Sequence, residues 1–268
     1  MAKNPVAVQH VDVSLVDWPA GLDGLRIAHV SDLHFRERNR VTDAAQELLL
    51  TLDYDWVAAT GDFGAVRSRW RAAADLTSEF FEPIVARRPV YAVLGNHDDP
   101  NIATGRKCAI EFLRNSSVTI QHNGTSLQLA GVDQNVRDAE NLTGAMGDTV
   151  DGVATILLAH YPSIIFRVPP GRVALVLAGH THGGQIRLPG LGCLWPNDAI
   201  SGRMARGLSD VSGTKLHVSA GIGVSPPIRW RFNCPAEVSI LTLRAAARDQ
   251  SGQAETGALA KLEKRALV

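Results

Sequence analysis

The chain has 268 residues, of which 45% are hydrophobic and 20% are charged, and its formal net charge at pH 7 is +0. This composition is typical of a folded globular protein and excludes a largely disordered one. The balanced charge gives no support for long nucleic acids as partners, because these bind basic surfaces. We expect one substantial core, near the upper size limit of a single domain.

Residues 1–8 lack the apolar stretch and the cleavage site of a signal peptide. No run of the sequence approaches the roughly 18 apolar residues that a membrane helix needs. The cysteines, Cys108, Cys193 and Cys234, are widely spaced and form neither a C-x-x-C motif nor a disulfide framework. We expect a reducing, cytoplasmic location, and peripheral contact with the inner face of a membrane is left open.

Short apolar runs rich in β-branched residues alternate with turn residues and predict strands along the chain. Several runs are apolar almost throughout, as are strands that are buried on both faces. The predicted strands are 26–31, 56–60, 90–94, 127–132, 154–159, 173–178, 216–219 and 238–243.

Three segments predict helices, namely 41–52, 70–85 and 108–115, and Thr42 and Asp43 are candidate caps of the first. Strands and helices alternate early, and strands dominate later. This order predicts an α/β fold in which helices pack around two central sheets.

We expect residues 1–245 to form one domain. The segment 246–268 is rich in Ala, Lys, Glu and Gln and predicts a polar extension, either helical or partly disordered. Leu259, Leu262 and Ala266 would form a small apolar stripe there, which fits packing against the core or a partner.

Five short motifs of imidazole, carboxylate and amide side chains each follow an apolar run. Carboxylate and carbonyl oxygens suit Mn²⁺ and Mg²⁺, whereas imidazole suits Zn, Fe, Ni and Cu. Each motif stands where a strand would end and an active-site loop would begin. Their polar members, in chain order, are Asp32, His34, Asp62, Asn96, His97, Asp98, His160, His180 and His182.

Two of the motifs place a pair of ligands two residues apart. In an extended segment, residues i and i+2 point to the same side, so Asp32 and His34 can reach one ion. The pair His180 and His182 repeats this spacing. Either pair alone is equally consistent with a buried structural contact, but both together, each after an apolar run, indicate a metal site.

The other three motifs gain meaning from their place in the series. An isolated Gly-Asp is normally a turn and a lone histidine is normally structural, but Asp62 can bridge two metals and His160 can bind one. Asn96 offers an amide oxygen. His97 can act as a ligand, an acid or an electrostatic stabiliser, and Asp98 can orient its ring.

The ordered pattern D-x-H, G-D, G-N-H-[D/E], H and G-H-x-H resembles that of the calcineurin-like metallophosphoesterases, with every position filled here. The match begins near Leu25 and continues to Leu243. It implies a four-layer α/β/β/α sandwich with two central mixed sheets. Segments 24–34 and 179–189 resemble the YkuE/YaeI-type phosphodiesterase branch, whose members commonly carry an N-terminal anchor or export signal that this chain lacks.

The resemblance implies two divalent metal ions, with Mn²⁺ expected first and Fe, Zn, Ni or Mg sharing the same ligand types. His97 would face the phosphate and the leaving group instead of binding metal, with Asp98 behind it. The implied ligands are Asp32, His34 and His182 for one ion, Asn96, His160 and His180 for the other, and Asp62 as the bridge.

These features predict a phosphodiesterase in which a hydroxide between two metals attacks phosphorus. The expected substrate is a small phosphodiester or a nucleotide- or lipid-linked phosphate. Alternatives are a UDP-2,3-diacylglucosamine-type pyrophosphatase of lipid A synthesis, a cyclic-nucleotide phosphodiesterase, a nuclease and a protein phosphatase. An inactive scaffold of this fold is the alternative from another class, although no ligand has been lost. The oligomeric state is left open.

Four residues beyond the motifs leave two interpretations each. Arg229 and Arg231 lie on a loop that can reach a second phosphate, but a solvated surface pair is the simpler expectation. Trp195 and Trp230 can line a substrate wall or belong to the core.

Overall fold

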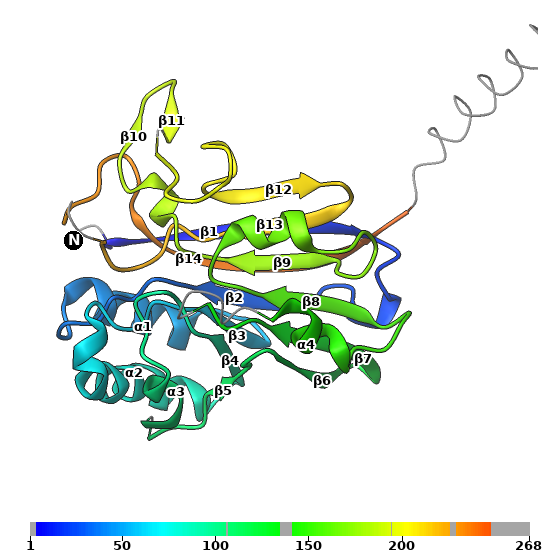
Figure 1. Ribbon diagram of the computed structural model, residues 1–268, viewed down its shortest axis with the longest axis horizontal. Coiled ribbons are helices and arrows are strands. Elements are labelled where there is room, and N and C mark those ends of the chain that lie inside the picture. The colour runs from blue at the N-terminus through cyan, green and yellow to red at the C-terminus, as the bar shows by residue number, and fades with distance from the viewer. Residues whose placement is uncertain (1–3, 106, 135–140, 194, 226–228, 248–268) are drawn as a thin grey trace, which may run out of the picture.

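The computed structural model describes residues 4–105, 107–134, 141–193, 195–225 and 229–247. Two six-stranded mixed sheets pack face to face (Figure 1), which confirms the predicted fold class. The order in the first sheet is β1 (Val6–Val16), β14 (Ala236–Ala246), β2 (Arg26–Val30), β3 (Trp56–Thr60), β4 (Val90–Val93) and β5 (Glu111–Phe112).

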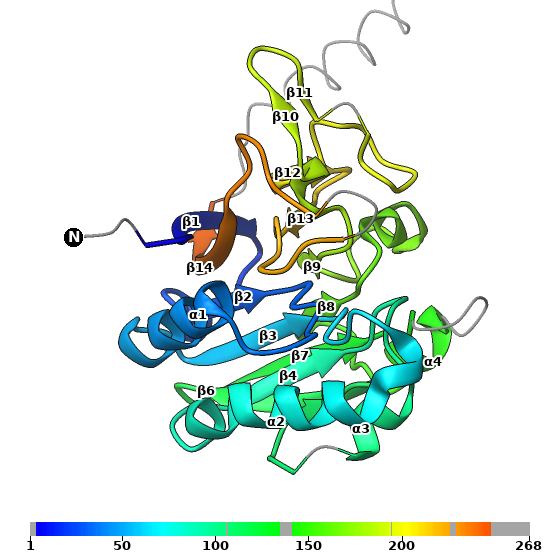
Figure 2. The ribbon, with the colours of Figure 1, turned by 90° about the vertical axis from the view of Figure 1, so that its left-hand side faces the viewer.

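The second sheet has parallel strands at its centre and an antiparallel strand at each edge. Its order is β12 (Gly207–Val211), β13 (Thr214–Val218), β9 (Leu175–Ala178), β8 (Ala154–Leu158), β7 (Thr125–Gly131) and β6 (Ser116–His122). A small separate hairpin, β10 (Arg187–Leu188) and β11 (Gly192–Cys193), projects beyond it (Figure 2).

Alternating side chains along the central strands divide the interior into three apolar layers. In β3, Trp56 and Ala58 pack between the sheets, whereas Val57 and Ala59 pack under the helices. In β8, Ile156 faces the intersheet layer and Leu157 faces the outer layer of the second sheet. The structure therefore has four layers of secondary structure, namely helices, two sheets and helices again. One apolar layer of side chains fills each of the three interfaces between them.

The helices flank the sheets, and α2 lies along the outside of the first sheet (Figure 2). The predicted helices 41–52 and 70–85 are confirmed. The described α-helices are α1 (Arg40–Thr51), α2 (Trp70–Val85), α3 (Asn101–Gly105) and α4 (Leu142–Gly147). Short 3₁₀ turns occur at Ala20–Leu22, Arg67–Arg69, Pro162–Arg167 and His182–Gly184.

The N-terminal cap of α1 is Asn39, which corrects the prediction of Thr42 or Asp43. The Asn39 side chain accepts hydrogen bonds from the backbone N–H groups of Val41 and Thr42. The Thr42 hydroxyl accepts one in return from the Asn39 N–H. This reciprocal arrangement is a capping box, so Thr42 stabilises the helix from its third position.

The predicted helix over residues 108–115 is wrong, because this segment contains the edge strand β5. Glu111 and Phe112 lie beside Tyr91 and Ala92 of β4, and the Leu113 N–H donates to the Ala92 carbonyl at 2.8 Å. Pairing with β4 therefore overrides the local helical pattern.

No helix among the described residues is long and apolar enough to cross a membrane. The last described strand, β14, ends at Ala246. The predicted polar extension lies outside the described residues from position 248 onward, as does the apolar stripe predicted there.

Candidate metal centre

The five motifs follow the carboxyl ends of strands in both sheets. β2, β3 and β4 are parallel neighbours in one sheet, and β8 and β9 are parallel neighbours in the other. Parallel strands end at the same edge of a sheet, and β3 contacts β9 across the sandwich. The loops after these strands converge at one end of the molecule.

The first group of metal-ligating atoms comes from Asp32, His34 and His182, whose side chains lie close enough together to hold one ion. The Nε2 atoms of His34 and His182 are 3.0 Å apart, and His182 Nε2 lies 3.4 Å from Asp32 Oδ1. All three residues are buried. This is the first of the two ligand sets predicted from the sequence, now found as one cluster.

A second group joins Asp62 and His160, with Asp32 also within reach. His160 Nε2 lies 3.3 Å from Asp62 Oδ2 and 3.0 Å from Asn96 Oδ1. Asp62 Oδ2 also lies 3.4 Å from Nε2 of His34. One carboxylate oxygen therefore stands between a histidine of each group.

His180 lies at the margin of the second group. Its ring packs against those of His160 and Tyr161, with centroids 5.1 and 4.4 Å apart. Its Nε2 lies 2.9 Å from the Asn197 carbonyl oxygen, which can only accept a hydrogen bond. Nε2 therefore carries the proton, and Nδ1 is the nitrogen with a lone pair for a metal.

The backbone at the site is strained. A positive φ costs a residue with a side chain roughly 1–2 kcal/mol relative to the ordinary helical region, although Asp and His tolerate it better than most. Such strain concentrates at functional sites, where the surrounding structure holds it in place. The site residues with positive φ are Asp32 (53°), His34 (46°), Asp62 (56°), His180 (70°) and His182 (51°).

Two glycines let the loops after β3 and β4 approach each other. Gly61 has a φ of 88°, and a Cβ placed on it would lie 2.6 Å from the backbone nitrogen of Gly95. A Cβ on Gly95 would lie 2.6 Å from the backbone nitrogen of Asp62. Any side chain at either position would therefore push Asp62 away from Asn96.

Comparison with known proteins agrees with this geometry. The family model of the calcineurin-like phosphoesterases matches residues 25–184, which contain all five motifs. The chain belongs to this family. It is 25% identical over 242 residues to the uncharacterized metallophosphoesterase YkuE of Bacillus subtilis (strain 168), covering 85% of this chain and 82% of that protein.

This phosphoesterase is also 27% identical over 235 residues to the phosphodiesterase YaeI of Escherichia coli (strain K12), covering 81% of this chain and 82% of that protein. Among solved structures, a 5'-nucleotidase precursor from Thermus thermophilus superposes with a TM-score of 0.43 at 14% identity. That superposition covers 59% of this chain and 42% of the other.

In the cluster of candidate ligands, the His160 ring carries an additional proton beside two carboxylates, at a position that would also suit a metal cation. Burial disfavours charge, yet the carboxylates of Asp62 and Asp32 raise the pKa of His160 to about 10. Burial likewise opposes ionisation of Asp62, but the neighbouring His160 holds the pKa of that carboxyl well below its usual range. A divalent ion would neutralise the same carboxylates and displace this proton.

The imidazoles of His34, His180 and His182 are neutral near pH 7. Burial lowers the pKa of His34 and of His180 to about 4, and it lowers the pKa of His182 well below its ordinary value. Burial raises the pKa of Asp32 to about 6. Neutral imidazole and ionised carboxylate are the forms that bind metal, so the oxygen and nitrogen donors present here fit divalent cations.

His97 lies beside the two groups of candidate ligands. Its ring meets the His34 ring edge-on, with centroids 5.0 Å apart, and its backbone N–H donates to Asp62 Oδ1 at 2.8 Å. The prediction that Asp98 orients the His97 ring needs correction. The Asp98 carboxylate accepts hydrogen bonds from the backbone N–H groups of Gly64 (3.0 Å) and Gly95 (2.9 Å), and thereby fixes both loops.

The sequence does not indicate the backbone carbonyls that orient the candidate ligands. His160 Nδ1 donates to the Thr60 carbonyl at 2.8 Å, and His180 uses that of Asn197. Any residue type supplies a carbonyl, so no sequence signal marks these positions.

The two loop arginines and the two tryptophans are now distinguishable. Arg229 is exposed, but Arg231 points inward and donates hydrogen bonds to backbone carbonyls, so the predicted solvated surface pair is wrong for Arg231. Trp195 and Trp230 are 79% and 58% exposed, which excludes a core position for either.

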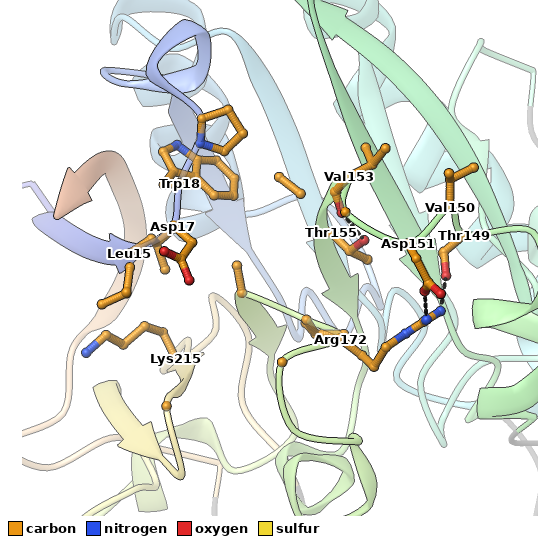
Figure 3. A pocket seen from close by; sticks show the side chains of 18 of the residues that line it. Leu15, Asp17, Trp18, Thr149, Val150, Asp151, Val153, Thr155, Arg172 and Lys215 are labelled. Atoms are coloured by element: carbon orange, nitrogen blue, oxygen red, sulfur yellow. Dashed lines mark hydrogen bonds and ion pairs between the residues drawn. The ribbon is translucent and has the colours of Figure 1, made fainter. Parts of the chain in front are cut away.

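A cavity of about 730 Å³ lies at the amino ends of β8, β9 and β13 (Figure 3). None of the candidate metal ligands is among the residues that line it. Trp18 and Leu15 form part of its wall. Its basic side chains are paired: Lys215 Nζ lies 2.7 Å from Asp210 Oδ2, and Arg172 forms an ion pair with Asp151.

Proposed function

We propose that this chain is a phosphodiesterase that uses two divalent metal ions. The observation that supports this proposal is the position of Asp62, whose Oδ2 lies 3.4 Å from His34 Nε2 and 3.3 Å from His160 Nε2. A carboxylate between two groups of buried ligands is suited to bridging two ions.

The proposed ligands follow the two groups, and Mn²⁺ is the metal we expect first among Mn, Fe, Zn, Ni and Mg. Two bound cations supply Lewis-acid stabilisation of phosphoryl oxygens and lower the pKa of water. Asp32, His34 and His182 would hold one ion, Asn96, His160 and His180 would hold the other, and Asp62 would bridge them.

In this proposal His97 is the residue that acts on the substrate. Its half-buried ring lies edge-on to the ring of His34, one of the proposed ligands, with centroids 5.0 Å apart. From there it can stabilise negative charge on a phosphoryl oxygen or protonate the leaving oxygen. Asp98 assists indirectly, by holding the backbone of the loop that carries His97.

The substrate we propose is a small phosphodiester or a nucleotide- or lipid-linked phosphate. A relative named as a phosphodiesterase, YaeI, supports the diester class. The more specific pyrophosphatase of UDP-2,3-diacylglucosamine is a candidate to be measured in parallel. A cytoplasmic location stays a prediction from the sequence.

A panel of substrates tests this function. The protein, reconstituted with each candidate metal, is offered bis(p-nitrophenyl) phosphate, p-nitrophenyl phosphate, cyclic nucleotides and UDP-2,3-diacylglucosamine, with His97→Ala as the matched control. We expect the diester to be preferred over the monoester. Preference for the monoester would overturn the diesterase assignment, and two bound metals without hydrolysis of any substrate would support the scaffold alternative.

A further inference from the structure

Arg231 contacts the loops that hold Asp32 and His182, two members of the first ligand group. Its Nη2 donates hydrogen bonds to the carbonyls of Ala220 (2.8 Å) and Gly221 (3.1 Å), and its Nε donates to Gly223 (3.1 Å). Its Nη1 lies 3.4 Å from the carbonyl oxygens of both His182 and Cys234. One guanidinium thus joins three chain segments: the loops after β9 and β13, and the segment just before β14.

The loop after β13 in turn contacts Asp32 directly. The Gly223 N–H donates to the Asp32 carbonyl at 2.6 Å, and the Ile222 N–H donates to the Ser31 carbonyl at 3.0 Å. A Cβ placed on Gly221 would lie 2.7 Å from the Cβ of Asp32. A shift of this loop therefore moves Asp32, just as a shift of the neighbouring segment moves His182.

Two rings of the second ligand group are oriented by contacts that do not involve Arg231. His160 is oriented by the Thr60 carbonyl and His180 by the Asn197 carbonyl. Within the described residues, the hydrogen bonds of Arg231 go to the segments of His182, Ala220–Gly223 and Cys234, and none goes to these supports.

We propose that Arg231 is a positioning residue for one metal only, the ion held by Asp32, His34 and His182. The planar guanidinium has five N–H donors in a fixed arrangement, which suits several carbonyls converging from different loops. A lysine ammonium has three donors on a flexible stem and reproduces only part of this pattern. The proposal rests on the two-metal function proposed above.

Metal stoichiometry tests the proposal without relying on turnover. Wild type, Arg231→Met and Arg231→Lys are equilibrated with Mn²⁺ in a chelator buffer, and bound metal is counted by mass spectrometry. We expect two ions in the wild type and one in Arg231→Met, with affinity for the second ion at least about tenfold weaker. Arg231→Lys should lie between them.

Arg229→Ala is the matched control, because Arg229 lies two residues away on the same loop and is exposed. We expect it to retain both ions. Should Arg231→Met fail to fold, judged by circular dichroism of the metal-free protein, Arg231→Lys decides with the same measurement.

Two results would overturn the proposal. Two ions at wild-type affinity in the Arg231 variants would show that the residue does not support the site. Equal weakening of both ions would show a general structural role. Either result leaves the proposed function intact, whereas a wild type that binds no metal would overturn the function and the role of Arg231 together.

Discussion

The two ends of the sandwich are built on the same strands but compensate their charges differently. At the carboxyl ends, Asp32 and Asp62 are buried among histidines, and within the described residues neither forms an ion pair with lysine or arginine. At the amino ends, Asp151 and Asp210 pair with basic side chains around the cavity. Buried carboxylates without such partners are costly unless a cation binds. Buried carboxylates that lack a lysine or arginine partner therefore mark the candidate metal centre better than hollow volume does.

Removing the negative charge of Asp62, the proposed bridge between the two metal ions, should remove the difference between the two ends of the sandwich. In Asp62→Asn a neutral amide replaces the carboxylate between the two groups, so we expect loss of at least one metal. We also expect kcat/KM on bis(p-nitrophenyl) phosphate to fall by about 10²–10³-fold or more. Metal content and steady-state kinetics measure this. A variant that keeps both ions and near-normal turnover would show that Asp62 is not the bridge.

A second variant separates catalysis from metal binding at the same end of the sandwich. His97→Ala should retain both ions and lose turnover by about 10²–10⁴-fold, most on diesters with poor leaving groups. His10→Ala serves as control, because His10 is exposed on β1, far along the chain from every motif. Metal content near zero in His97→Ala would instead make His97 a ligand.

Affinity for metal should rise with pH. The folded-state pKa of His160, about 10, exceeds its ordinary value of 6.5. Its proton thus stabilises the metal-free fold fully below pH 6.5, and this stabilisation is lost as pH rises toward 10. Metal must displace that proton, so the increase in Tm on adding Mn²⁺ should grow from pH 6.5 to 9. A constant increase would contradict this, and His160→Gln should flatten the trend.

The smallest effect is expected at the opposite end. Lys215→Met removes a partly exposed ion pair with Asp210, which is worth at most about 1 kcal/mol. We expect less than a twofold change in turnover and unchanged metal content, measured alongside urea unfolding. A tenfold loss of activity would show that the two ends influence each other.

The sequence predicts central strands well and edge strands poorly. All eight predicted strands exist, whereas β1, β6 and β12 are not predicted and β5 is predicted as a helix. These four are the outer strands of the two sheets. Each has only one neighbouring strand. Its positions include exposed or half-buried residues, as in β6, so it lacks the continuous apolar run that marks a strand between two others.

The proposed ligands are equally predictable from the sequence, but the residues that support them are not. The motifs are visible because metal binding demands particular side chains at short spacing. Asn197 and Thr60 act through backbone carbonyls, which any residue provides. Arg231 lies 49 positions from His182 along the chain, so its contact exists only in the folded protein.

The order of the strands in the first sheet also determines when the protein can fold during its synthesis. β1 joins its sheet only through β14, with Val6 beside Ala236 and Val16 beside Ala246. During synthesis on the ribosome, all five motifs have been made once the chain reaches His182. At that point β14 has not been made, so β1 lacks its neighbouring strand and one edge of β2 is unpaired. We expect a chain that stops before Ala236 to contain all the proposed ligands and yet form no stable site. Synthesis of β14 supplies the strand that pairs with both β1 and β2.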